Sequence, residues 1–186
     1  MILICAMMTS IAIVREKETG TMEILLVSPM KPIYIVLSKI APYFVLSCIN
    51  FATIILLSVF VLNVPVAGSF ASLIVVSLIY IFVSLALGLL ISTLTSSQLA
   101  AMMISGMALM IPVMLLSGMI FPVENMPTWL QWISNFVPAR WYISAAKSIM
   151  IKGLGITSVL KELSVLSVMG ITLLLISLKK FKIRLE

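Results

Sequence analysis

The sequence has 186 residues, of which 62% are hydrophobic and 10% charged, with a net charge of +6. Average soluble domains carry roughly 25% charged residues. This composition therefore excludes a soluble globular fold and indicates an integral membrane protein built from apolar helices of roughly 20 residues each. The basic residues lie between and after the apolar runs, where they orient the protein against anionic lipid rather than bind nucleic acid.

The missing residue types exclude several kinds of chemistry. The chain has no histidine, and its six acidic residues are all glutamate. His-based catalytic triads, HExxH zinc sites and aspartyl dyads are thereby excluded. No GxxxxGK[ST] motif is present, so the chain does not bind ATP in the manner of a P-loop. We expect no cofactor on this chain, and any ATP that drives it must be bound by a partner.

The N-terminal region predicts the end of a helix and a polar connection. Residues 1–14 are apolar but too short for a full span, and the charged cluster of residues 15–18 follows. Gly20 suits the left-handed position that ends a helix. Thr21 suits the N-cap of a short following helix, whose positive first turn would hold Glu23. That helix should stop at the proline-containing stretch that precedes the next apolar run.

Four longer apolar runs predict complete transmembrane helices, and short polar turns connect them. The first of these runs exceeds the roughly 30 Å hydrocarbon core, so its first turns should lie at the interface with Lys39 snorkelling. The third should bend at Pro112. The runs cover residues 33–62, 70–93, 99–120 and 156–178.

Residues 121–156 hold all three tryptophans and predict an interfacial helical hairpin. The first helix would place Trp129, Trp132, Ile133 and Phe136 on one face, at helical spacing. A second helix after Pro138 would end at Gly153. Its polar face would carry Arg140, Ser144, Lys147 and Ser148.

The basic residues also predict an orientation. Placing the cluster near residue 15 and the C-terminal tail in the cytoplasm puts eight basic residues inside and four outside, as the positive-inside rule favours. An even number of complete spans lets both ends share that side. The hairpin of residues 121–156 would then lie on the outer face.

Two segments resemble a known family, the permeases of ABC-2 type exporters. Residues 15–29, REKETGTMEILLVSP, are similar to the cytoplasmic segment between the second and third spans of that family. Residues 116–131, LSGMIFPVENMPTWLQ, resemble the family's signature after the fifth span, as does PARWY at residues 138–142. The basic tail fits as well, and the similarity runs through essentially the whole chain.

The resemblance implies an all-α, polytopic membrane domain over residues 1–186, with one partial and four complete transmembrane helices in the cell's inner (plasma) membrane. It implies a non-enzymatic permease subunit that exports a substrate using ATP hydrolysed by a separate ABC ATPase, paired with a second permease. Family members begin with another span and often an external domain, so we expect a fragment or truncated reading frame. The cargo is not specified. One alternative is a channel or scaffold subunit without ATP coupling. The other is a membrane-embedded hydrolase.

The resemblance also implies functional segments. Residues 15–32 would contain the helix that contacts the ATPase, whereas an ordinary solvated loop is the alternative. Residues 121–156 would close the outer end of the pathway, or serve only to anchor the protein at headgroup depth. The candidate coupling residues are Glu16, Glu18, Gly20, Thr21 and Glu23, and the candidate outer-gate residues are Phe121, Pro122, Glu124, Trp129, Trp132 and Arg140.

Three helical patterns offer further candidates. Met103, Met107, Met110 and Met114 form a stripe suited to a path for apolar cargo, although plain packing is the commoner reason for such a stripe. Ser84, Gly88 and Ser92 are spaced to allow close helix approach within or between subunits. Ser144 and Lys147 have the spacing of a Ser–Lys pair, but a solvated polar face explains them better.

Overall fold

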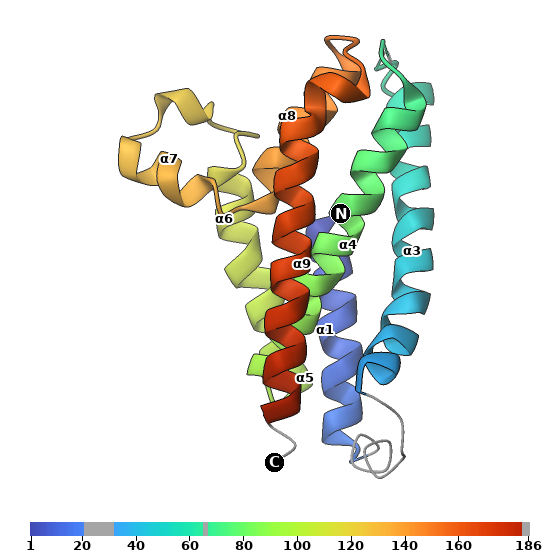
Figure 1. Ribbon diagram of the computed structural model, residues 1–186, viewed down its shortest axis with the longest axis vertical. Helices are drawn as coiled ribbons and strands as arrows, with labels where there is room; N and C mark the ends of the chain where they lie inside the picture. The colour runs from blue at the N-terminus through green and yellow to red at the C-terminus, as the bar shows by residue number, and fades with distance from the viewer. Residues whose placement is uncertain (21–31, 65–66, 184–186) are drawn as a thin grey trace.

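A computed structural model describes residues 1–20, 32–64 and 67–183 of the chain (Figure 1). The regular secondary structure of the described part is helical, and a π-helical segment joins α5 to α6. Two short 3₁₀ turns lie at Val123–Asn125 and Ile156–Val159. The α-helices are α1 (Ile2–Glu18), α3 (Pro32–Phe60), α4 (Phe70–Leu94), α5 (Gln98–Met103), α6 (Leu109–Leu116), α7 (Thr128–Ser134), α8 (Pro138–Met150) and α9 (Leu160–Ile183).

Four segments are long and apolar enough to cross a membrane, as the sequence predicts. Figure 1 shows them as a bundle in which successive spans run in opposite directions. The end of α1, the start of α3, the start of α5 and the end of α9 meet at one end of the bundle. This arrangement confirms the all-α, polytopic fold. The four spans are Leu37–Phe60, Phe70–Leu94, Gln98–Leu116 and Ile156–Lys180.

Helix α4 forms the centre of the bundle, and its most extensive neighbours are α1 and α9. Small residues make the approach of α1 possible. A Cβ atom added to Gly88 would lie 2.6 Å from the carbonyl oxygen of Ala6 and 2.9 Å from Cβ of Thr9. Ser84 and Ser92 are fully buried, and each donates its hydroxyl to a carbonyl of its own helix. The predicted small-residue spacing therefore serves contacts within this chain.

The span formed by α5 and α6 is interrupted by a π-helical segment, Ile104–Ala108. Pro112 lacks the N–H group that an α-helix would direct at the carbonyl of Ala108, the last residue of this segment. The irregularity thus precedes the proline at which the sequence predicts a bend. The span also ends at Leu116 rather than at the predicted Ile120, because Gly118 adopts a positive φ of 76° and the chain turns away.

Candidate functional site

The end of α1 near residues 15–20, predicted to lie in the cytoplasm, is the first candidate site. The charged cluster of residues 15–18 forms the last turn of α1 rather than a connection outside it, so the predicted coupling segment begins within a helix. Thr19 caps the helix, and Gly20 has a φ of 72°, which confirms its predicted left-handed conformation. Thr21 and Glu23 lie outside the described residues.

This turn is bonded to the connection between α4 and α5. The carboxylate of Glu18 accepts the backbone N–H of Gln98 at 2.8 Å and also accepts from the Gln98 side chain. Gln98 is the first residue of α5, so the carboxylate lies at the positive end of that helix. The hydrogen bonds, chiefly that of the Gln98 side chain, hold the pKa of Glu18 below its ordinary value. Lys17 donates to the carbonyl of Ser92 near the end of α4.

The same turn is bonded to α3. Lys39 forms an ion pair with Glu16 and does not simply snorkel to the interface as predicted. A cavity of about 570 Å³ lies beside this pair, between α1, α3 and the start of α5. Met8, Tyr43 and Gln98 contribute to its lining. Through this turn, α1 is therefore connected to two spans, α3 and α4, and to the start of a third.

The sequence identifies Glu16 and Glu18 but not their partners. Both carboxylates bind groups of the same chain, although the sequence suggests them as docking points for a second protein. The long-range partners lie 23 and 80 residues away, and only the fold brings them close. The sequence gives one indication of the partner of Glu18. A predicted polar connection precedes Gln98, and the N-terminus of the helix that begins there attracts a carboxylate.

The hairpin of residues 121–156, predicted to lie on the outer face, is the second candidate site. Helix α7 contains Trp129, Trp132 and Ile133, as predicted, but it ends at Ser134, so Phe136 lies beyond it. Trp129, Trp132 and Phe136 are 63%, 74% and 78% exposed in the chain. The amphipathic rings of the two tryptophans suit the headgroup level. Phe121, Pro122 and Glu124 are also exposed, in the loop and 3₁₀ turn between α6 and α7.

Arg140 connects the two helices of the hairpin, α7 and α8. Its Nη1 atom donates to the carbonyl of Gln131 at 3.2 Å, to Oγ of Ser134 at 3.2 Å and to Oδ1 of Asn135 at 2.9 Å. The guanidinium also lies 5.7 Å from the ring centroid of Trp141. Arg140 thus holds the end of α7 against the start of α8, a contact that the sequence does not reveal.

Helix α8 confirms the second predicted helix, but it is not solely interfacial. Ala145 and Ile149 are fully buried, and the helix packs against α4 and α9. Tyr142 stacks on Tyr80 of α4 with ring centroids 4.1 Å apart. The helix ends at Met150, before Gly153, whose φ of 66° belongs to the following turn.

The predicted Ser–Lys pair does not form a nucleophile and base. Oγ of Ser144 donates to Oε1 of Glu162 at 3.3 Å. Acylating serines are instead activated by a base within hydrogen-bond reach that takes their proton. Within the described residues, no cluster of three metal-binding side chains occurs either.

The methionine stripe lies on the surface of the chain. The four side chains are between 40% and 64% exposed, so they do not pack in its interior. The wider turns of the π-helical segment rotate the second pair relative to the first. The exposed positions are Met103, Met107, Met110 and Met114.

Comparison with known proteins agrees with this architecture. Residues 1–179 match the family described as "ABC-2 family transporter protein". The chain is 36% identical to "Probable multidrug ABC transporter permease YbhS" of Escherichia coli K12 over 153 residues, 82% of the chain and 41% of the relative. It is 36% identical to "Probable multidrug ABC transporter permease YbhR" of the same strain over 144 residues, 77% of the chain and 39% of the relative.

A longer alignment relates 97% of the chain to 48% of "Inner membrane transport permease YhhJ" of E. coli K12, at 29% identity over 183 residues. The chain therefore spans less than half the length of these curated relatives. No solved structure matches it. The family match covers nearly the entire chain, and the four apolar spans suit a transporter membrane protein. The chain belongs to the ABC-2 family of transporter membrane proteins.

Proposed function

We propose that this chain forms part of the membrane-spanning subunit of an ATP-driven exporter in a bacterial inner membrane. A separate ABC ATPase would hydrolyse the ATP, and a second permease subunit would complete the pathway. The names of the E. coli relatives, which describe ABC transporter permeases and an inner membrane transport permease, support this proposal. The observation that carries it furthest is the bonded cytoplasmic end of α1.

A motor outside the membrane needs a stiff connection to the spans that it moves. Force applied just beyond Gly20 would reach α1 directly. It would reach α5 through Glu18 and Gln98, and α3 through the ion pair of Glu16 with Lys39. Three helices would therefore respond together to one contact. A solvated loop with no coupling role would not require these bonds.

The coupling proposal can be tested by reversing a charge that follows these bonded residues in the sequence. Glu23→Lys is expected to weaken ATPase association by at least tenfold, because close interfacial charge pairs contribute roughly 1.5–7 kcal/mol. The measurement is co-purification of the ATPase with the permease, together with a cell-surface labelling assay for insertion. Glu124→Lys, in the outer hairpin, is the matched control and should leave association unchanged. Normal ATPase association and coupled transport in the Glu23→Lys protein would exclude the proposed coupling segment.

The face of α5 and α6 that carries the methionines is the proposed border of the pathway with the second permease. Only 11% of the residues in the most apolar window of this span are buried within the chain. Flexible thioether side chains can adapt to varied apolar groups. This exposed surface would thus serve either the cargo or the facing subunit.

ATP dependence distinguishes an exporter from a channel. Vesicles that contain the permease and its ATPase should accumulate a fluorescent amphiphile only when ATP is present. A channel would let a permeant probe equilibrate without ATP. If the Glu23→Lys variant and the unaltered protein transport the probe equally fast when ATP is absent, the result would favour the channel.

A further inference from the structure

The outer side of the molecule contains a pocket that neither the coupling proposal nor the anchoring role of the tryptophans explains. Its volume is about 380 Å³, within the range of small-molecule sites. Its walls are formed by the end of α6, the part of the hairpin before α8, and one face of α8. The polar side chains that line it are those of Ser117, Glu124, Gln131, Arg140, Ser144 and Lys147.

A buried hydroxyl is the first sign of a ligand. Ser117 is 2% exposed, and its Oγ atom has no hydrogen-bond partner among the described residues. A buried polar atom without a partner costs free energy, and such an atom in a native protein commonly marks an absent water, ion or ligand. Ser117 lines the pocket, so a group bound there can supply the missing partner.

Two cations in the same pocket lack anionic partners among the described residues. The three acceptors of Arg140 are a carbonyl, a hydroxyl and an amide oxygen, none of which carries a charge. Lys147 is exposed one turn away from Ser144 on α8. Within the described residues, the only ion pair is that of Lys39 with Glu16, at the other end of the molecule. A phosphate group would match these two cations and the Ser117 hydroxyl.

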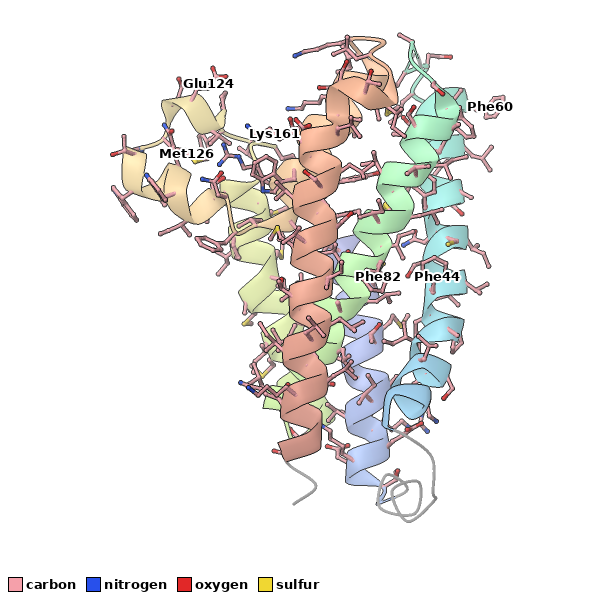
Figure 2. The ribbon with its side chains drawn as sticks, viewed as in Figure 1. Phe44, Phe60, Phe82, Glu124, Met126 and Lys161 are labelled. Atoms are coloured by element: carbon pink, nitrogen blue, oxygen red, sulfur yellow. The ribbon has the colours of Figure 1, made fainter. Side chains whose placement is uncertain are left out.

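The pocket also contains one carboxylate. Glu124 lines it from the 3₁₀ turn of the hairpin. Figure 2 shows Glu124 at the upper edge of the hairpin. It also shows Lys161 near the start of α9, on the side of that helix that faces the hairpin. Glu124 would repel a purely anionic ligand, but it would attract an amine joined to the phosphate.

We propose that this pocket binds the headgroup of a zwitterionic phospholipid that carries a phosphate and a primary amine. The phosphate would accept hydrogen bonds from Ser117, Arg140 and Lys147, and the ammonium would bind Glu124. The exposed rings of Trp129 and Trp132 belong to α7, the helix that also contributes Gln131 to the pocket, and they suit a molecule held at headgroup depth. The same chemistry fits a resident bilayer lipid or an amphiphile in transit.

The test uses the permease purified with its associated subunits and titrated with short-chain phosphatidylethanolamine or phosphatidylglycerol. Native mass spectrometry counts the bound lipid. We expect the unaltered protein to prefer phosphatidylethanolamine. Lys147→Met should weaken binding of both lipids by about tenfold, since a hydrogen bond to a charged group contributes about 1.5 kcal/mol or more. Lys152→Met is the matched control, because this exposed lysine lies outside the pocket.

Two further variants test the parts of the headgroup. Ser117→Ala should weaken binding of both lipids several-fold and leave the thermal stability unchanged, because the hydroxyl has no partner among the described residues. Glu124→Gln should weaken phosphatidylethanolamine binding and strengthen phosphatidylglycerol binding. An unchanged ratio between the two lipids in Glu124→Gln would overturn the zwitterionic assignment. An equal loss in Lys152→Met and Lys147→Met would overturn the pocket itself.

The source of the lipid is read from its response to ATP. Release of bound phosphatidylethanolamine during ATP hydrolysis would identify a transported amphiphile. Retention through many cycles would identify a resident lipid. Both results support the site. The binding measurements do not require ATP, so their outcome is independent of the proposed transport function.

Discussion

The second and third complete spans are both strongly apolar but differ in how much of each is buried within the chain. In α4, 61% of the residues in the most apolar window are buried, against 11% in the span formed by α5 and α6. The helix α4 is the more apolar of the two, and the size of the side chains adds to the difference. Buried serines and Gly88 allow other helices to approach α4 closely, whereas the next span carries large methionines on its surface. Apolar composition lets a helix span the membrane, and small residues let other helices pack closely against it within the bundle.

The largest expected effect comes from filling the contact between α1 and α4. Gly88→Val should destabilise the protein by about 3 kcal/mol, the upper part of the range for overpacking, because backbone atoms of Ala6 cannot move aside. Unfolding in detergent, followed by circular dichroism, measures the loss. Gly106→Ala is the control, since its Cβ would meet only the flexible end of Met7 at 3.4 Å. Equal stability of the two variants would contradict the importance of this close approach.

Truncating one apolar side chain in each span should give a smaller but equally clear contrast. Leu89→Ala removes a fully buried side chain and should cost about 2–5 kcal/mol. Met107→Ala removes a side chain that is 64% exposed and should change stability by no more than about 0.5 kcal/mol. The same unfolding assay measures both. A large loss in Met107→Ala would mean that a second subunit is required for folding.

Disulfide crosslinking tests what covers the exposed span. In a background with Cys5 and Cys48 replaced by alanine, Met107→Cys should form an oxidant-dependent covalent dimer if two copies of this chain face each other. Leu57→Cys on α3 has similar exposure and should remain monomeric. Non-reducing gel electrophoresis of oxidised membranes gives the result. Equal crosslinking at both positions would argue against a specific subunit border along α5.

The smallest expected effect concerns the bond between α1 and α5. The hydrogen bonds from Gln98 lower the pKa of Glu18 from its ordinary value of 4.5, so they favour the charged form. Their stabilising effect is present above that ordinary value and is lost as the pH falls through the lowered pKa. The melting temperature of the unaltered protein should therefore exceed that of Glu18→Gln slightly at neutral pH. The difference should disappear at strongly acidic pH, and a constant difference would contradict an electrostatic origin.

The sequence predicts the spans well because each one is encoded locally. The apolar runs, the glycine at residue 20 and the tryptophan spacing of α7 are all readable within a single helical segment. The spacing of Ser84, Gly88 and Ser92 predicts a close approach, but it does not identify α1 as the neighbour.

The contacts of the candidate sites could not be predicted in the same way. Glu18 binds a group 80 residues away, and the carboxylate carries no signal that selects this partner over water or a second protein. The pocket on the outer side depends on Ser117, Glu124 and Lys147, which belong to three different elements. Their meeting follows from the packing of α8 against α4 and α9, which the sequence predicts only as an amphipathic surface helix.

The π-helical segment Ile104–Ala108 makes one place in its span tolerant of a change in length. Its hydrogen bonds span one more residue than those of an α-helix, so it takes up one extra residue without ending the span. Deleting a single residue from it would restore α-helical geometry and leave the direction of everything beyond it nearly unchanged, because the wider turn has already absorbed that residue. Deleting one residue from the regular part of the span would instead turn everything beyond the deletion by about 100°, the angle of one residue in an α-helix, and would point the α7 tryptophans in another direction.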